Sequence, residues 1–261
     1  MLAQQRQAAI LNLIRRTGGA KVGHLVRQFG VSDMTIRRDL EALADRGLVA
    51  KVHGGATITA TSSADEPGFE AKSVRQRAQK EAIAAYAASL VLPGTAVALS
   101  AGTTTAAMAG RLADIRGLTI VTNSLPAAET LYRANHEDQT VVLTGGIRTR
   151  SDALTGPVTE AAIASLNVDL LFLGVHGMSV RSGFTTPNLL EAVANRLLVA
   201  AARRIVVLAD ATKWDTVGVA TIAQLEAADI LITDDGIADA ARTELAARVG
   251  ELVVVTAAHQ H

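Results

Sequence analysis

The sequence predicts two domains, a small α+β domain followed by a larger α/β domain with a mainly parallel sheet. Three observations lead to this fold class. Residues 1–58 show helical spacing of apolar residues and then an alternating segment with a glycine turn. Residues 59–73 are small, polar and without periodicity, which is typical of a linker. In residues 74–261, short apolar runs alternate with helical patterns, as in a parallel sheet covered on both faces.

The composition excludes several classes of protein and site. Of the 261 residues, 49% are hydrophobic but only 3% are aromatic, so the core must be mainly aliphatic. The chain has no cysteine, which excludes disulfides, zinc sites built from thiolates, and cysteine nucleophiles. No secretory signal is evident, and the longest apolar stretch is broken by Pro93-Gly94. We therefore expect a soluble protein without a membrane partner, and the lack of cysteine fits a cytoplasmic location.

Three helices are predicted in the first domain. Apolar residues recur at helical spacing within residues 3–16 and again within 22–29, and each segment is followed by glycine. A third helix is predicted to begin at Ser32, a favourable N-cap, and to stop at Gly47. Its apolar residues Ile36, Leu40 and Leu43 form one face, which predicts that Asp33, Met34, Thr35, Arg37 and Arg38 point toward solvent.

A hairpin is predicted to follow the third helix. The segment LVAKVHGGATI alternates around a His53-Gly54-Gly55 turn. Two helices joined by a tight turn and followed by a hairpin are typical of a winged helix-turn-helix, which binds double-stranded DNA. The charge of this segment also favours DNA binding. Residues 1–58 hold nine Lys/Arg and four acidic residues, a net of +5 in a chain of zero net charge.

The solvent face of the third helix and the hairpin supply the candidate DNA-binding residues. Arginine can bind guanine through two hydrogen bonds, and hydroxyls can bind phosphate. The alternative is an ordinary solvated helix with an Arg38–Glu41 pair. The predicted DNA-binding residues are Lys21, Ser32, Asp33, Met34, Thr35, Arg37, Arg38, Lys51 and His53.

Seven short apolar runs in the second domain are predicted to be buried strands. They span residues 96–100, 118–123, 140–146, 170–175, 204–210, 230–235 and 252–256. Helical patterns separate most of them, at 76–91, 104–113, 125–135, 157–166, 188–202 and 237–248. Loops that follow parallel strands gather at one edge of the sheet, where open α/β folds bind ligands.

One segment strongly resembles a known family. VSDMTIRRDLEALADRGLVAKVHGGA, from Val31 to Ala56, matches every fixed position of the N-terminal signature of DeoR-family bacterial transcriptional regulators. That family's second domain is a sensor related to ribose-5-phosphate isomerase, and residues 74–256 follow its order of elements. The resemblance implies a homo-oligomeric repressor of carbohydrate-metabolism genes, a dimer or tetramer, controlled by a phosphorylated sugar or related effector.

The loop LSAGTTT, at residues 99–105, is the candidate phosphate site. Glycine lets the backbone approach a ligand, while threonine hydroxyls and the first N–H groups of the following helix can bind an anion. Small residues at such a junction are also common for tight packing alone. The resemblance favours phosphate, because the sensor family keeps a similar S-G-T-T loop for its ligand.

Other strand-end loops complete the predicted effector site. Lys213 follows a strand in a segment that resembles the family's D-S-S-K pattern. Structural alternatives stay open for three of the others: Gly145 as a turn, Asn123 as a helix cap, and His176 as a structural histidine. The predicted effector-binding residues are Ser100, Gly102, Thr103, Thr104, Thr105, Asn123, Gly145, Arg148, His176, Glu191 and Lys213.

The sequence predicts binding rather than catalysis. The related isomerases carry an aspartate-rich D-G-A-D-E loop, and Leu173 and His176 stand here in place of the two aspartates. Glu191 is the one acid that resembles an isomerase residue, and His176 also replaces the sensor family's aspartate, which makes it a candidate specificity determinant. The alternatives are an isomerase-like enzyme with a DNA-binding appendage and a DNA-binding protein whose second domain only oligomerises. Neither a metal site nor a cofactor is predicted.

Overall fold

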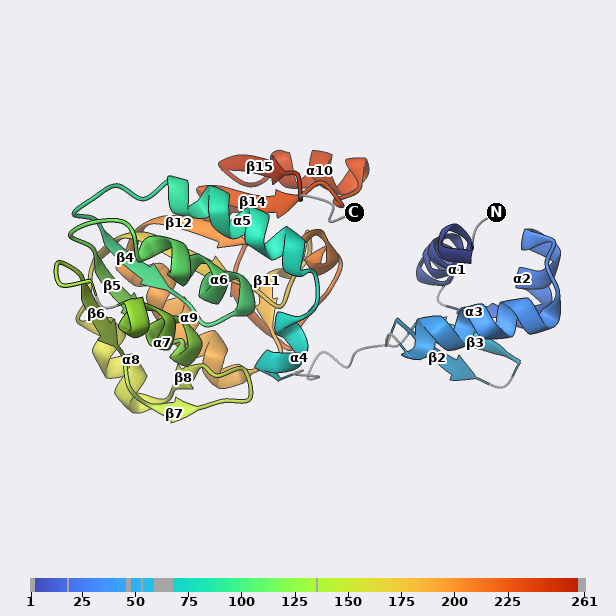
Figure 1. Cartoon of the computed structure of the whole chain (residues 1–261), viewed down its shortest axis with the longest axis horizontal. Coiled ribbons are helices and arrows are strands. Elements are labelled where there is room, and N and C mark those ends of the chain that lie inside the picture. The colour runs from blue at the N-terminus through green and yellow to red at the C-terminus, as the bar shows by residue number, and fades with distance from the viewer. Residues whose placement is uncertain are drawn as a thin grey trace. The chain divides into compact units, whose positions relative to one another are not determined.

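The structure is a computed structural model that describes residues 3–257, apart from 18, 46–47, 53, 59–67 and 135. The chain divides into two compact units, residues 1–61 and 62–261, which we call the N-terminal and C-terminal units (Figure 1). No helix among the described residues is long and apolar enough to cross a membrane. The finer boundaries expected at residues 58 and 74 stay a prediction.

The N-terminal unit contains the predicted three helices and hairpin. The helices are α1 (Ala3–Thr17), α2 (Val22–Phe29) and α3 (Asp33–Asp45), and the strands are β1 (Gly19–Lys21), β2 (Val49–Val52) and β3 (Gly55–Ile58). The strands form an antiparallel sheet in the order β1-β3-β2. Strand β1 was not predicted, because three residues between two helices are too few to show an alternating pattern.

The end of α2 and the start of α3 form as the sequence predicts, while Gly47, the predicted stop of α3, lies outside the described residues. Gly30 follows α2 in the left-handed conformation, with φ of 63°, which glycine adopts without strain. Ser32 precedes α3, and its Oγ accepts a hydrogen bond from the Thr35 N–H at 3.2 Å. Ile36, Leu40 and Leu43 are buried together against Ile10 of α1, so the predicted core face of α3 is confirmed.

The C-terminal unit is built on a seven-stranded sheet in which all neighbouring strands are parallel. The strand order is β15-β14-β12-β9-β4-β5-β6. The strands are β4 (Ala96–Leu99), β5 (Thr119–Thr122), β6 (Thr140–Leu143), β9 (Val168–Gly174), β12 (Ala202–Leu208), β14 (Ile230–Asp234) and β15 (Glu251–Val255). These are the seven predicted strands, and the predicted fold class is confirmed.

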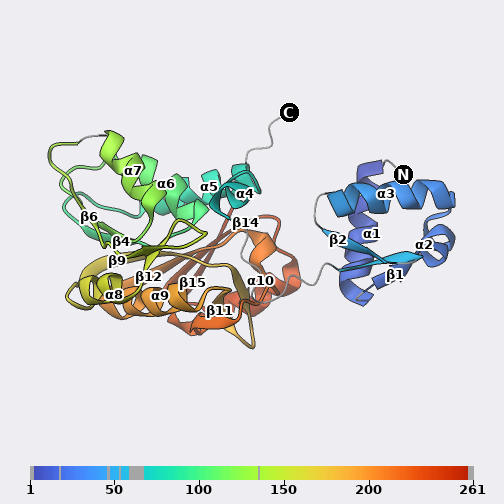
Figure 2. The ribbon, with the colours of Figure 1, turned by 90° about the horizontal axis from the view of Figure 1, so that it is seen from below.

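Helices cover both faces of this sheet (Figure 2). One face carries α5 (Arg77–Ser89), α6 (Thr103–Leu112) and α7 (Leu125–Ala134), and the other carries α8 (Pro157–Ala164), α9 (Leu189–Ala201) and α10 (Asp239–Ala246). Each layer has its own aliphatic core, in which Phe172 and Phe184 are the largest fully buried side chains. The low aromatic content is therefore compatible with two extended hydrophobic layers.

Several short elements were not predicted. They are α4 (Phe69–Ser73), β7 (Ile147–Arg148), β8 (Leu154–Thr155), β10 (Gly177–Ser179), β11 (Gly183–Thr186), β13 (Ala220–Ala223), and the 3-10 turns η1 (Ala211–Lys213) and η2 (Leu225–Ala227). Helix α4 lies within the segment that we interpreted as a linker. It packs on the C-terminal unit, because Lys72 Nζ donates to Ser151 Oγ at 2.7 Å and Phe69 N–H donates to the Arg150 carbonyl at 3.3 Å.

The strand order has one topological switch point at the carboxyl edge of the sheet. From β4 the chain continues to β5 and β6 on one side, and then crosses to β9 and the remaining strands on the other. The strand order therefore reverses between β4 and β9. In open α/β folds, ligands bind outside the carboxyl ends of the strands at such a point.

Candidate functional site

The first candidate surface is the solvent face of α3. Asp33, Met34, Arg37 and Arg38 are exposed, with Met34 61% exposed, and Thr35 is half-buried. The predicted orientation of this helix is therefore confirmed. A large apolar side chain surrounded by arginine, hydroxyl and carboxylate groups can contact thymine methyls and base edges. The DNA-binding role of these residues stays a prediction.

The two arginines of α3 differ in their surroundings. Arg37 Nε donates to Asp33 Oδ1 at 2.5 Å, and this hydrogen bond raises the pKa of Arg37 above its ordinary value. No such contact holds Arg38 among the described residues. The Arg38–Glu41 pair of the alternative interpretation is absent there, because Glu41 instead accepts a hydrogen bond from Lys51 Nζ at 2.6 Å.

The Lys51–Glu41 contact joins the hairpin to α3. It lowers the pKa of Glu41 and brings a predicted DNA-binding lysine beside the helix. Lys21, also exposed, ends β1 directly before α2. His53 lies outside the described residues. Lys21, Lys51 and the exposed face of α3 thus belong to one small unit, but their common contact with DNA stays a prediction.

A buried ion pair behind α3 was missed by the sequence analysis. Arg6 of α1 donates to Asp39 of α3 through Nε at 2.6 Å and Nη2 at 3.3 Å, and Gln7 Nε2 donates to the same carboxylate at 3.1 Å. The side chains of Arg6 and Asp39 are only 12% and 4% exposed. The signal was present in the sequence, because Asp39 follows Ile36 by three residues and therefore lies on the apolar face.

The second candidate site lies at the carboxyl ends of β4 and β9. The two backbones approach closely there, since a Cβ on Gly174 would lie 3.5 Å from the Ala101 carbonyl oxygen and 3.8 Å from Gly102 Cα. Ser100 Oγ accepts a hydrogen bond from the Gly174 N–H at 2.9 Å. Ser100, which is fully buried, thus joins the loop after β4 to the end of β9.

The threonines of residues 103–105 are not equivalent. Thr105 is fully buried and donates to the Gly102 carbonyl at 3.0 Å, and Thr104 is also buried. Thr103, at the first position of α6, is the accessible one and lines a cavity of about 250 Å³ together with Lys80. Tight packing therefore accounts for part of this loop, while Thr103 and the start of α6 stay open to a ligand.

Asn123 has a structural contact that the sequence did not specify. Its Oδ1 accepts from the Ala101 N–H at 2.9 Å, and its Nδ2 donates to the Leu154 carbonyl at 3.1 Å. It therefore braces the loop after β4 from the end of β5. The suggestion that Asn123 caps the next helix is wrong, because Ser124 Oγ accepts from the Ala127 N–H near the start of α7.

The remaining strand-end residues take different positions. Gly145 has φ of 71°, as a turn requires, and its carbonyl accepts from Thr159 Oγ1. Arg148 is exposed and pairs with Asp152 at 2.7 Å. Glu191 accepts from Thr149 Oγ1 at 2.6 Å. His176 is half-buried in the loop between β9 and β10, and its main-chain N–H donates to Thr185. Their effector-binding roles stay a prediction.

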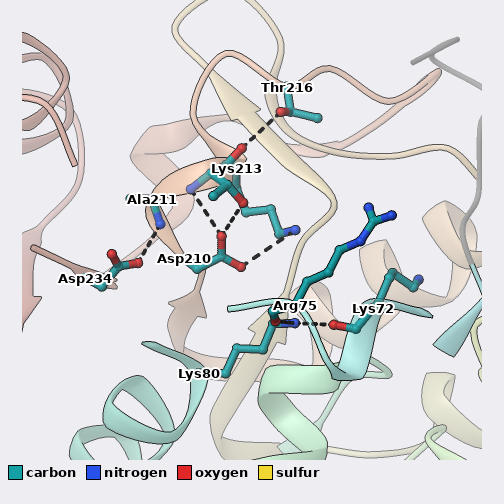
Figure 3. Close-up of polar contacts among 9 residues, drawn as sticks. Lys72, Arg75, Lys80, Asp210, Ala211, Lys213, Thr216 and Asp234 are labelled. Carbon is teal, nitrogen blue, oxygen red and sulfur yellow. Dashed lines mark hydrogen bonds and ion pairs between the residues drawn. The ribbon is translucent and has the colours of Figure 1, made fainter. Parts of the chain in front are cut away.

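A cluster of charged groups lies at the carboxyl ends of β12 and β14 (Figure 3). Lys213 Nζ of η1 lies 3.7 Å from Asp210 Oδ2, which is buried and has no hydrogen bond among the described residues. The other oxygen, Asp210 Oδ1, accepts from both the N–H and the hydroxyl of Thr212. A buried carboxylate oxygen that accepts no hydrogen bond within the protein is suited to accept one from a hydroxyl group of a ligand.

Lys80 of α5 completes this cluster and was not predicted. It is only 5% exposed, and its Nζ donates to the carbonyls of Lys72 at 2.5 Å and Arg75 at 2.7 Å. Burial lowers the pKa of Lys80 to about 8, although the nearby Asp210 carboxylate acts in the opposite direction. Its position before Ile83 on the apolar face of α5 was the signal in the sequence.

The arrangement as a whole can bind an anion. Lys80 lines the same cavity as Thr103, together with Arg77 and Glu81, so the cavity adjoins the first turn of α6 and a lysine whose Nζ is held by main-chain carbonyls. A helix N-terminus and a partly desolvated lysine both favour a negatively charged ligand. Among the described residues, no group of three or more histidine or acidic side chains is placed to hold a metal ion.

Family models match most of the chain. A model described as the DeoR-like helix-turn-helix domain matches residues 6–62, and one described as the DeoR C terminal sensor domain matches residues 75–235.

Full-length relatives agree with these matches. The chain is 40% identical to the HTH-type transcriptional regulator GlpR of Haloferax volcanii, over 97% of this chain and 98% of that protein. It is 34% identical to the transcriptional repressor AccR of Agrobacterium fabrum, over 89% and 90%. It is 33% identical to a putative aga operon transcriptional repressor of Escherichia coli O157:H7, over 89% and 87%. Among solved structures, a ribose 5-phosphate isomerase from Methanocaldococcus jannaschii aligns over 52% of this chain and 54% of that chain, with 17% identity and a TM-score of 0.39.

Proposed function

The chain belongs to the DeoR family of transcriptional regulators, and from this premise we propose that it represses genes of carbohydrate metabolism under the control of a phosphorylated sugar. The observation that carries this proposal is the pairing of a DNA-binding unit and a sensor unit in relatives named as repressors. The isomerase alternative is not favoured, because the relatives that match along nearly their whole length are named as regulators. The repressor would act in the cytoplasm, on double-stranded operator DNA.

The exposed face of α3 would enter the major groove, with the hairpin against the flanking backbone. Two such units, presented by a homo-oligomer, would bind two half-sites of an operator. Arg38 is the first candidate for base contact, because no side chain holds it among the described residues. The Asp33–Arg37 contact would orient the second arginine before DNA binds.

Replacing Arg38 or Arg37 by alanine is expected to weaken operator binding about 5- to 150-fold each, since a good arginine–base contact is worth about 1–3 kcal/mol. Fluorescence anisotropy measures this affinity, with the full-length protein and the DNA upstream of its own gene at fixed salt concentration. Arg242→Ala, at an exposed position of α10, is the control and is expected to leave binding unchanged. Unchanged binding in both α3 variants would exclude α3 as the recognition helix.

The carboxyl ends of β4 and β9, with the cavity beside the start of α6, would hold the effector. We propose that the first turn of α6, together with Lys80 and Lys213, binds the phosphate. Asp210 Oδ2 would accept a hydrogen bond from a hydroxyl group of the sugar. The unit would bind the sugar without converting it, because Leu173 and His176 stand where the related isomerases carry aspartates. His176 is the candidate for distinguishing one sugar from another.

One phosphorylated sugar is expected to shift the anisotropy curve when a panel of such compounds is added to the protein–DNA complex. The same compound should stabilise the C-terminal unit, because a ligand at about 100 times its Kd adds about 2.7 kcal/mol. The unphosphorylated sugar is the matched control and should have little effect. If DNA binds and no compound changes the curve or the melting temperature, the sensor role fails while the DNA-binding role stands.

A further inference from the structure

Residues 68–76, which we call the α4 segment, comprise α4 and the turn before α5 and follow residues 59–67 directly. The Phe69 N–H donates to the Arg150 carbonyl at 3.3 Å, and Lys72 Nζ donates to Ser151 Oγ at 2.7 Å. Both acceptors belong to the turn between β7 and β8. Part of the predicted linker is therefore held by the C-terminal unit.

Lys80 of α5 holds the other end of this segment. Its Nζ donates to the main-chain carbonyls of Lys72 and Arg75 at 2.5 and 2.7 Å. These carbonyls lie at and just after the end of α4, where main-chain acceptors lack partners within the helix. Gln76, the next residue, has φ of 52°, which is unfavourable for a residue with a side chain. The turn between α4 and α5 therefore depends on the Lys80 ammonium.

Docking of the α4 segment gathers positive charge at one place. Lys72 and Arg75 lie there with Lys80 and with the Asp210–Lys213 pair (Figure 3). Burial is the main cause of the lowered pKa of Lys80, and the Asp210 carboxylate acts against it. The positive charges of Lys213, Lys72 and Arg75 lower this pKa further. An anion bound nearby would offset the repulsion among these groups.

The α4 segment also forms one wall of the cavity of about 250 Å³. Phe69, Ser73 and Val74 line the cavity from this segment. Thr103 lines it from the start of α6, and Lys80 lines it from α5. A ligand in this cavity would therefore meet the α4 segment as well as the two helices.

We propose that the α4 segment is a wall of the effector site and that the negative charge of the effector holds this segment on the C-terminal unit. The proposal rests on the phosphate site of the proposed function and identifies the element through which occupancy of that site reaches the linker. An anion in the cavity favours the charged form of Lys80, and hydrogen bonds from a charged donor are stronger than those from a neutral one. Both contacts of Lys80 with the segment would therefore be strengthened. Without the anion, release of the segment would lengthen the chain that joins the two units.

Hydrogen exchange of the full-length protein tests this coupling, with inorganic phosphate as the probe and chloride at the same ionic strength as the reference. Saturating phosphate should slow the exchange of the main-chain amides of residues 69–76 about five-fold or more, which is the lower end of typical couplings between sites. The amides of α10 are the internal control and should be unchanged. If phosphate raises the melting temperature of the C-terminal unit but leaves exchange in residues 69–76 unchanged, the inference fails alone. If phosphate changes neither quantity, the phosphate site and the inference fail together.

The variant Ser151→Ala tests the coupling from the other direction, because coupling between two sites is reciprocal. The substitution removes the acceptor of Lys72, and Ser151 does not line the cavity. The amides of residues 69–76 should exchange faster, and the affinity for phosphate, measured by calorimetry, should fall by up to the factor that phosphate adds to their protection. Ser165→Ala, which removes an exposed hydroxyl at the end of α8, is the matched control and should behave as wild type. Faster exchange with unchanged affinity for phosphate would overturn the inference, because the segment would then be released without any effect on the site.

Discussion

Replacing Asp39 by alanine is expected to unfold the N-terminal unit and abolish operator binding, although Asp39 itself is too buried to touch DNA. The substitution leaves the Arg6 guanidinium without its carboxylate in a nearly closed environment, and the Gln7 amide loses its acceptor. Removing one partner of a buried ion pair is among the most destabilising single changes. A unit of about 60 residues is only marginally stable, so we expect this loss to leave it unfolded.

Hydrogen exchange of the full-length protein measures the loss of folded structure. The main-chain amides of residues 3–17 and 33–45 should lose their protection from exchange. Asp33→Ala is the matched control, because it removes an exposed partner of arginine on the same helix and should leave exchange nearly unchanged. The double substitution Arg6→Met with Asp39→Leu should restore much of the protection, since no buried charge is then left unpaired. Native protection in Asp39→Ala would show that the ion pair does not hold α1 on α3.

Replacing Lys80 by methionine is expected to abolish the response to the effector while operator binding persists. Methionine retains the apolar length of the side chain but removes the positive charge of a residue that lines the cavity with Thr103. Hydrogen bonds to a charged group are worth about 1.5–3 kcal/mol, so affinity for the phosphorylated sugar should fall about 10- to 150-fold. Calorimetry with the active compound of the panel measures this, and Lys51→Met in the N-terminal unit is the control. Unchanged affinity in Lys80→Met would exclude the cavity beside α6 as the phosphate site.

The lowered pKa of Lys80 also predicts that the affinity for the effector depends on pH. Burial lowers that pKa to about 8, so the ammonium is present at pH 7 and is lost as the pH rises through about 8. A phosphate monoester is fully ionised in this range, because its second pKa is about 6. Affinity for the effector should therefore decrease above pH 8 in the wild type. The decrease should be absent in Lys80→Met, in which no group titrates at this position.

Some elements of the C-terminal unit could be predicted from the sequence, and others became evident only in the structure. All seven strands of the large sheet could be predicted, because each is a run of apolar residues between helical patterns. The short strands β7, β8, β10, β11 and β13 could not, since two to four residues carry no periodicity. The end of β6 was placed three residues too late, because Gly145 and Gly146 adopt positive φ and leave the strand.

The same division holds for the two candidate sites. The sequence by itself determined the helices other than α4, the exposed face of α3, and the glycine and threonine loop after β4, because local spacing and residue type fix these features. Only the tertiary structure decided which polar groups meet. It paired Arg6 with Asp39 across 33 residues, set Asn123 to brace the loop after β4, and brought Lys80 to a cavity beside Thr103. A buried charge or amide takes its partner from whichever element packs against it, and that choice depends on the folded chain rather than on local sequence.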